Sequence, residues 1–213
     1  MKNSFFTYLI GGCLIALFTT SCINEDYNLD NIDKQGVFSP EGISIPVGNL
    51  NKIELDFEFE GILDEAGYEK DFEDFFTESL FDRFIIKKDG KEEGIGNIEF
   101  SADFRAYIKN EKSEITVSVI AQALDERGQK IVEMFNDEMY ANNNEDELED
   151  QPFILKVAKE DMIKMRRAKI LRFSFKVNTR EFDVSNEDDN YVEIKNMLIK
   201  STGGIAFDLD SND

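Results

Sequence analysis

The chain has 213 residues, 45 acidic and 24 basic, so its formal net charge at pH 7 is −21. A charge of this sign repels phosphate-rich polymers, which excludes nucleic acids as partners. Hydrophobic residues make up 41% of the chain and include 19 phenylalanines, which predicts a folded domain with a real core rather than a disordered chain. Histidine is absent, which removes the usual general base near neutral pH and the commonest zinc ligand.

The first 21 residues are predicted to be a lipoprotein signal peptide. Lys2 provides a positive start, and the uncharged, mostly apolar segment 5–18 is shorter than the roughly 20 residues of a membrane-spanning helix. This segment ends in small residues directly before Cys22. The Cys22 thiol would receive a diacylglyceryl group and, with its acyl (palmitate-type) chains, anchor the protein in a membrane. Signal peptidase would then leave Cys22 as the first residue of the mature chain.

This segment resembles the bacterial lipobox, with Thr19 where the familiar pattern has Leu or Val. Cys13 follows a locally better match, but cleavage there would leave a very short apolar run before the cut and apolar residues on the mature end. We therefore place the lipid on Cys22. A retained membrane anchor is the alternative, and both interpretations put the domain outside the cytoplasm. With Cys22 lipidated, no disulfide can form in the mature chain.

Residues 22–36 are predicted to be a lipidated acidic tether, and residues 37–213 a single domain. Asn24, Glu25 and Asp26 directly follow the lipidated cysteine. They resemble the surface-export signal of Bacteroidetes lipoproteins, so we expect a lipid-anchored outer-membrane protein displayed at the cell surface. A plain solvated tether is the alternative interpretation of these three residues.

The segment after the anchor also resembles a family of Bacteroides-type outer-membrane lipoproteins. Mature chains of this family begin with an acidic Asp-Tyr-x-Leu-x-x-Ile-Asp segment, followed by a short strand that ends in Ile-Pro-x-Gly. The resemblance implies a β-rich envelope domain and supplies no biochemical role. The matching residues here are Asp26, Tyr27, Leu29, Ile32, Asp33, Ile45, Pro46 and Gly48.

Strands are predicted wherever apolar and polar residues alternate, because the side chains of a strand point to its two faces in turn. The segments 98–108 and 114–124 each carry an apolar residue at every second position and are separated by a polar loop, 109–113, which predicts a hairpin. A turn at 125–128 follows. Segment 194–210 is expected to form a second hairpin around Gly203-Gly204. Both hairpins are further points of resemblance to the lipoprotein family. Other strands are predicted at 53–60, 152–157 and 170–177.

Two segments have helical spacing. Residues 61–84 predict one or two short helices inserted between strands, with the aromatic residues in the core. The residues near helical spacing are Tyr68, Phe72, Phe75, Phe76, Ser79 and Phe84. A binding platform is the alternative role for these aromatic residues. A turn is expected at Asp89-Gly90. Residues 159–169 predict one or two helical turns with methionines inward and arginines outward, and the arginines as partners of the acidic surface.

Two acidic segments are candidate calcium sites, since carboxylates are the ligands that calcium prefers. On the strand 53–60, neighbouring carboxylates on one face lie about 7 Å apart, too far to share one ion, so a solvated face is the better interpretation. Residues 183–194 lack the Gly and Glu that an EF-hand loop requires, which leaves a weak surface calcium site as the alternative. We expect no metal site and no cofactor. The acidic segment 142–150 is expected to be an exposed loop.

These patterns together predict a mostly β protein, an antiparallel β-sandwich of about seven to nine strands with a small helical insertion. An antiparallel sheet with helices on one face is the alternative. We expect a non-catalytic lipoprotein that binds a glycan or a protein at the cell surface. The alternatives are a structural subunit of a surface fibre or envelope complex and, third, a glycoside hydrolase with a carboxylate pair, against which the absence of tryptophan counts.

Overall fold

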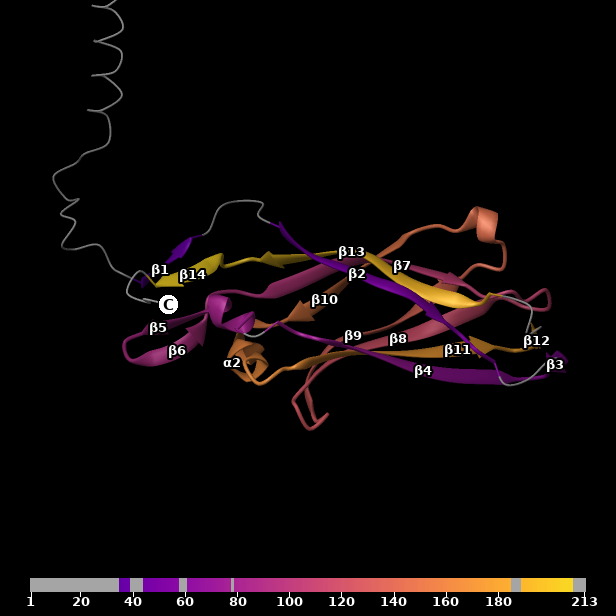
Figure 1. Ribbon diagram of the computed structural model, residues 1–213, viewed down its shortest axis with the longest axis horizontal. Helices are drawn as coiled ribbons and strands as arrows, with labels where there is room; N and C mark the ends of the chain where they lie inside the picture. The colour runs from indigo at the N-terminus through magenta and orange to yellow at the C-terminus, as the bar shows by residue number, and fades with distance from the viewer. Residues whose placement is uncertain (1–34, 39–43, 58–60, 78, 185–188, 209–213) are drawn as a thin grey trace, which may run out of the picture. The chain divides into compact units, whose positions relative to one another are not determined.

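A computed structural model of the chain describes residues 35–38, 44–57, 61–77, 79–184 and 189–208 (Figure 1). The strands are β1 (Gln35–Phe38), β2 (Ser44–Glu54), β3 (Gly61–Leu63), β4 (Ala66–Phe75), β5 (Ile85–Lys88), β6 (Lys91–Gly94), β7 (Ile98–Tyr107), β8 (Ile115–Leu124), β9 (Lys130–Ala141), β10 (Gln151–Val157), β11 (Ile170–Thr179), β12 (Phe182–Val184), β13 (Tyr191–Ser201) and β14 (Ile205–Asp208). The short helices are η2 (Phe81–Phe84), η3 (Glu145–Glu147), η4 (Lys159–Asp161) and α2 (Met162–Met165). β1 includes Gln35 and Gly36, which sequence analysis assigned to the tether.

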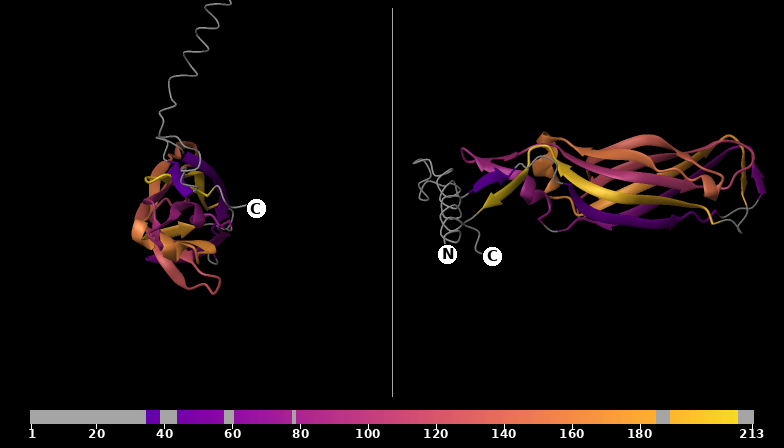
Figure 2. Two further views of the ribbon diagram at one scale, coloured as in Figure 1. Left: turned by 90° about the vertical axis from the view of Figure 1, so that its left-hand side faces the viewer. Right: turned by 90° about the horizontal axis from the view of Figure 1, so that it is seen from above.

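Eight of these strands form two four-stranded sheets that pack face to face (Figures 1 and 2). Sheet 1 has the order β10-β7-β13-β2, and sheet 2 has the order β4-β11-β8-β9. All neighbouring strands within the two sheets are antiparallel. The predicted mostly β class and antiparallel β-sandwich are therefore confirmed. The remaining strands form three short pairs, β1 with β14, β3 with β12 and β5 with β6.

The core lies between the two sheets and is built from every second residue of their strands. On β7 the six alternating apolar residues of segment 98–108 are all buried, as the sequence predicts. The inward residues of β8 and β11 are buried in the same way. Phe104 of sheet 1 stacks on Phe175 of sheet 2, with 6.5 Å between ring centroids. Each such aromatic side chain contributes about 1.5–3 kcal/mol of hydrophobic free energy on burial.

One lateral side of the sandwich is closed where β9 passes from sheet 2 toward sheet 1. The Gln151 side chain accepts a hydrogen bond from the Tyr140 backbone N–H (2.8 Å) and donates one to the Tyr140 carbonyl (2.7 Å). It therefore occupies the edge of β9 at this point, as a neighbouring strand would. Two residues later, Asn142 bonds through its backbone to Ala106 and Ile108 at the end of β7 (both 2.9 Å). An exposed sheet edge is thereby capped at this end.

The predicted hairpin of segments 98–108 and 114–124 is wrong. The two segments are strands, but β7 belongs to sheet 1 and β8 to sheet 2, and neither pairs with the other. Such alternation shows that one face of each strand is buried, and it does not show which sheet the strand joins. The polar loop between them crosses the roughly 10 Å that separate packed sheets. Residues 109–113 therefore form a loop that connects the two sheets, not a hairpin loop.

The helices predicted over 61–84 are replaced by a strand for most of this segment. Residues 66–75 form β4, an edge strand of sheet 2, and the one helical turn in the described part of the segment is η2. Tyr68 and Phe72 are four residues apart, a spacing that places two side chains on the same face of either a helix or a strand. They are half-buried, and together with Phe76 they pack against the core, as predicted. Phe84 is buried as well, but the prediction is wrong for Phe75, which is 72% exposed because it lies on the outer face of β4.

The predicted C-terminal hairpin is also wrong, because β14 pairs with β1 and not with β13. The reason lies at Gly203. A Cβ on this residue would overlap the backbone carbonyl of Ile95, so the glycine serves a close approach of two backbone segments rather than a tight hairpin turn. Next to it, the Thr202 N–H donates to the Asn97 carbonyl (3.0 Å).

Two turns predicted from the sequence are confirmed. Asp89 and Gly90 both have positive φ (51° and 76°) and join β5 to β6, the geometry that favours this residue pair in a two-residue hairpin turn. Asp125 begins the turn between β8 and β9, where its Oδ1 accepts hydrogen bonds from the N–H groups of Arg127 and Gln129 (both 2.9 Å). These bonds to the charged form lower the pKa of Asp125, the bond from Gln129 most strongly.

Candidate functional site

The residues predicted to carry the lipid and the export signal lie outside the part of the chain that the structure describes. These are Cys22, Asn24, Glu25 and Asp26. In the described residues, no helix has the length and the apolar character needed to cross a membrane.

The two acidic segments weighed as calcium sites fall partly within the described residues. Glu54 and Asp56 are exposed, in keeping with a solvated face, whereas residues 58–60 are not described. Of the second segment, Asp183 and Asp189 are described and residues 185–188 are not. In the described ranges, no group of three or more Asp, Glu, His or Cys residues is placed to hold a metal ion.

The basic segment 159–169 is folded as predicted. Met162 and Met165 are fully buried, and Arg166 points outward and bridges two acidic side chains, at 2.6 Å from Asp82 and 2.7 Å from Glu92. The hydrogen bond to Glu92 and then that to Asp82 raise the pKa of Arg166. The segment therefore serves as an intrachain partner of the acidic surface, which confirms the prediction.

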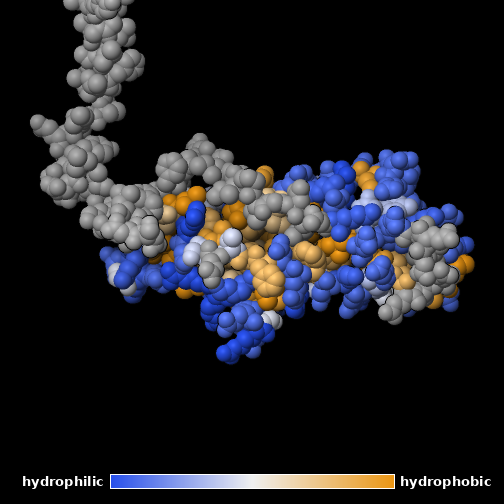
Figure 3. Space-filling model, in the orientation of Figure 1, coloured by the Kyte–Doolittle hydropathy of each residue, from blue (hydrophilic) through white to orange (hydrophobic). Residues whose placement is uncertain are grey.

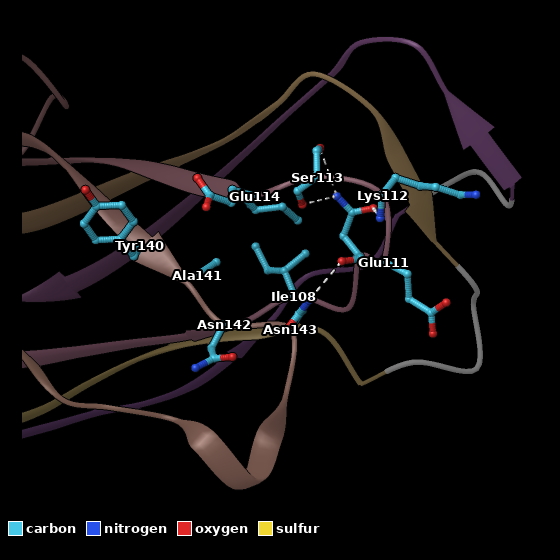
Figure 4. Close-up of a pocket in the computed structure, with 11 residues that line it drawn as sticks. Ile108, Glu111, Lys112, Ser113, Glu114, Tyr140, Ala141, Asn142 and Asn143 are labelled. Carbon is cyan, nitrogen blue, oxygen red and sulfur yellow. Dashed lines mark hydrogen bonds between the residues drawn. The ribbon is translucent and has the colours of Figure 1, made fainter.

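Adjoining hollows open at one end of the sandwich. One has a volume of about 390 Å³ and is lined by residues 108, 110–115 and 140–143. The other, of about 620 Å³, is lined by Thr116, residues 113–114 and residues 178–180. They share Ser113 and Glu114. We call this end, formed by residues 108–116, 140–143 and 178–180, the polar end, and Figure 4 shows one of its hollows.

The loop that crosses between the sheets at the polar end is fixed by Asn110, which is 1% exposed. Its Nδ2 donates to the carbonyls of Ser113 (2.9 Å) and Glu181 (3.0 Å), and its Oδ1 accepts from the Asp183 N–H (3.0 Å). Asn143 adds a bond from its own Nδ2 to the Asn110 carbonyl (3.3 Å). One buried amide thus joins the crossing loop to the segment that follows β11.

Ser113 reinforces the same junction. Its hydroxyl lies 2.7 Å from the Glu181 carbonyl and 2.6 Å from the Thr179 hydroxyl, which in turn bonds to the Glu114 carbonyl (3.3 Å). These contacts hold the backbone of the loop while leaving the side chain of Glu114 exposed. The floor of the polar end is therefore rigid, and its charged side chains lie at the rim.

Tyr140 stands at the edge of this rim. It lies on β9 and is 71% exposed. Its backbone N–H and carbonyl both bond to the Gln151 side chain on one edge of β9, and on the other edge Tyr140 lies opposite Thr116 of β8. An exposed aromatic ring on a fixed backbone offers an apolar surface at little entropic cost on binding. Figure 4 shows its ring on the far side of Glu114 from the crossing loop.

The acidic loop 142–150 also lies at this end, and it is exposed as predicted. Asn144 caps its helical turn η3, and Asp150 pairs with Arg105 on the outer face of sheet 1. The Tyr191 hydroxyl lies 3.5 Å from Glu145. Burial, and then the charge of Glu145, raises the pKa of Tyr191, while Lys52 packs on its ring at 3.9 Å from the centroid.

Away from the polar end, apolar side chains gather between β2 and β4. Figure 3 shows this hydrophobic region, bordered by hydrophilic side chains, on the face turned to the viewer. From β4 and the residues after it, Tyr68, Phe72 and Phe76 contribute half-buried aromatic rings. This is the lateral side opposite the one closed by β9 and β10.

Comparison with known proteins gives distant likenesses. No protein-family model matches the chain, and no curated protein sequence matches it. Among solved structures, a protein from Parabacteroides distasonis described as secreted matches 66% of this chain at 19% identity, with a TM-score of 0.44. The infectious bursal disease virus, Gx strain, matches 84% at 7% identity (TM-score 0.35). A Clostridium thermocellum xylanase in complex with xylohexaose matches 73% at 11% identity (TM-score 0.28).

The matches span only 38%, 33% and 29% of those three chains, respectively. Likenesses this distant carry no information about ligand or activity. Any functional assignment must therefore come from the residues of this chain.

The sequence did not single out the residues that build the polar end. Asn110, Ser113 and Glu114 lie in or beside the polar segment 109–113, which the sequence predicts to be a hairpin loop, and Tyr140 lies outside every element predicted from the sequence. One signal was present: an asparagine flanked by charged residues in a loop between two alternating strands. Its meaning depends on the two strands joining different sheets, which alternation does not reveal.

Proposed function

We propose that the protein is a non-catalytic binding module, anchored in the outer membrane by a lipid on Cys22 and displayed at the cell surface, with the polar end as its recognition surface. The lipid would hold the domain at the membrane almost permanently, because a lipoprotein cysteine carries two or three acyl chains. Repulsion among the many carboxylates would keep neighbouring copies from aggregating.

The observation that carries the proposal is the position of the polar end relative to β1. β7 runs from Ile98 at one end of sheet 1 to Tyr107 next to the polar end. β14, which pairs with β1, follows the Thr202–Asn97 contact at the opposite end of β7. Figure 1 shows β1 and the crossing loop at opposite ends of the sandwich. A tether that joins at β1 leaves the polar end free to meet a ligand.

The composition of the polar end favours binding over catalysis. A carboxylate-pair glycosidase needs two carboxyl groups about 5–10 Å apart in a cleft that grips the sugar. Here the hollows are open to solvent, Tyr140 is the one aromatic residue in their described lining, and the chain has no tryptophan and no histidine.

The anchor is tested by replacing Cys22, with Cys13 as the matched control. In cells, Cys22→Ser should abolish labelling by radioactive palmitate and release the protein from the membrane fraction, whereas Cys13→Ser should leave both unchanged. Membrane attachment that persists in Cys22→Ser, or is lost in Cys13→Ser, would overturn the assignment of the lipid.

Surface display is tested separately. A variant with alanine at Asn24, Glu25 and Asp26 should still be lipidated but should stay in the periplasmic leaflet of the outer membrane. Protease added to intact cells should then no longer degrade the protein. Degradation equal to that of the wild type would leave these residues as an ordinary tether.

A fibre or complex subunit is the second candidate, and the apolar region between β2 and β4 is the observation that favours it. A subunit that accepts a strand from its neighbour would use such a side of a sandwich. Native protein from cells should then run as a denaturant-resistant ladder on gels without boiling. A single monomer band would rule this candidate out.

A further inference from the structure

The rim of the polar end carries charged side chains that have no partner within the described residues. Glu111, Lys112, Glu114 and Arg180 are all exposed, and in the described part of the chain none of their side chains makes a hydrogen bond or an ion pair. Elsewhere many of the cations are used within the chain, as Arg105, Arg166 and Arg172 are. The rim therefore presents hydrogen-bonding groups that the fold itself leaves unused.

The charges of these four side chains balance one another, although the whole chain carries −21 and the acidic loop 142–150 lies at the same end. Two carboxylates accept hydrogen bonds, and one ammonium and one guanidinium group donate them. An anionic ligand would meet Glu111 and Glu114, and a cationic ligand would meet Lys112 and Arg180. The arrangement thus favours a neutral ligand whose groups both donate and accept.

Tyr140 adds an exposed apolar face beside these groups. The hollow that it lines also contains Glu114, so one ligand can contact the ring and the carboxylate together. A pyranose ring meets both demands, because its hydroxyl groups lie around the edge and its C–H groups form an apolar face that stacks on an aromatic ring.

A protein ligand fits less well. Stable protein interfaces bury about 800 Å² per partner around a cluster of apolar anchor residues. Among the residues that line the two hollows, Tyr140 is the one large hydrophobic side chain that is strongly exposed, since Ile108 and Ile115 are buried. Ile62 (55% exposed) and Leu63 (36%) lie on β3 at the same end of the sandwich but do not line the hollows.

We propose that the polar end binds a neutral oligosaccharide, with Tyr140 stacking on a sugar ring and with Glu114 and Arg180 bonding its hydroxyl groups. This inference rests on the proposed binding function and assigns its ligand class and its contact residues. The bonds of Asn110 and Ser113 hold the site in shape before the ligand arrives, which lowers the entropic cost of binding.

The test uses the full-length protein in detergent on an array of neutral, sulfated and sialylated glycans, followed by calorimetry with the best neutral oligosaccharide. Tyr140→Ala and Glu114→Gln should each weaken binding about tenfold, the size expected for one stacked ring or one hydrogen bond to a charged group. The matched control is Phe75→Ala, which removes an equally exposed aromatic side chain (72%) at the other end of sheet 2.

The outcomes separate the two proposals. Neutral glycan binding that is weakened by Tyr140→Ala and Glu114→Gln but not by Phe75→Ala supports the inference. If the protein binds neutral glycans and neither Tyr140→Ala nor Glu114→Gln weakens this binding, the polar end is not the binding site, although a binding function would stand. Retention of charged glycans alone, or of no glycan, overturns the ligand class. In that case, a purified protein ligand whose binding depends on Tyr140 would preserve the proposed function and reject the oligosaccharide.

Discussion

Replacing Asn110 by alanine should destabilise the domain more than any other single loss of a polar side chain at the polar end. The side chain is buried and makes three hydrogen bonds of 3.0 Å or shorter, to Ser113, Glu181 and Asp183. Each such bond contributes about 1 kcal/mol net, and partners left buried without water cost more. We expect Asn110→Ala to lower the free energy of unfolding by about 2–4 kcal/mol, out of the ~5–15 kcal/mol typical of a domain.

The assay is urea denaturation followed by far-UV circular dichroism. The midpoint should fall while the slope of free energy against urea stays constant, because the fold and the surface exposed on unfolding are unchanged. Asn143→Ala is the matched control: it removes one bond of 3.3 Å from an exposed side chain and should cost no more than about 0.5 kcal/mol. A loss below about 1 kcal/mol for Asn110→Ala would refute the view that this amide holds the crossing loop.

A second variant separates the donor from the acceptor role of this amide. Asn110→Asp keeps the oxygen that accepts from Asp183 but sets a carboxylate against the two carbonyls that Nδ2 now serves. At pH 7 its cost should equal or exceed that of alanine. Burial against carbonyls raises the folded-state pKa of the introduced carboxyl, so its cost should shrink as the pH falls and the group becomes protonated. A cost that does not depend on pH would contradict this geometry.

The remaining predictions concern other parts of the fold. Gly203→Ala should cost more than about 3 kcal/mol or prevent folding, since its Cβ would overlap the Ile95 backbone, and thermal unfolding measures this. Arg166→Ala should cost about 1 kcal/mol, because its two ion pairs are partly exposed, and the cost should shrink in 1 M salt. Asp125 has a lowered folded-state pKa, so its stabilisation is complete above the ordinary Asp pKa of about 3.9 and is lost as the pH falls through the lower value. The stability gap between wild type and Asp125→Asn should therefore narrow from pH 7 to pH 3, and a constant gap would contradict it.

The sequence was sufficient to predict where most of the strands lie, but not which strands pair with one another. Alternation located the buried faces of β7, β8, β10 and β11, because burial on one side of a strand leaves a period of two in the chain. It did not show that β7 and β8 lie in different sheets or that β14 pairs with β1. Pairing depends on contacts between residues far apart in the chain, which a local period does not contain.

The error over β4 has a different physical origin. Tyr68 and Phe72 recur at an interval that suits both periods, whereas Phe75 suits only the helical one. The polar residues of the strand are mostly acidic, which is common on helices as well as on edge strands. Residues 66–75 form a strand because they pair with β11, and Glu73 and Arg172 form an ion pair across the two strands. The site was missed for a related reason: Asn110 gains its role from Glu181 and Asp183, about 70 residues further along the chain.

The pairing of β1 with β14 determines how the domain would respond to a pull on the chain before Gln35, the direction in which the proposed lipid anchor would act. The two strands are antiparallel, with Gln35 opposite Asp208 and Phe38 opposite Ile205. A force applied before Gln35 and resisted through the chain before Ile205 therefore acts at opposite ends of the pair. The hydrogen bonds between β1 and β14 would therefore be sheared together rather than opened one after another. This two-stranded sheet would bear the force before the force reached β2. If the proposed site held a ligand in flowing liquid, the resulting pull would strain the β1–β14 pair first, while the two large sheets and the rim keep their shape.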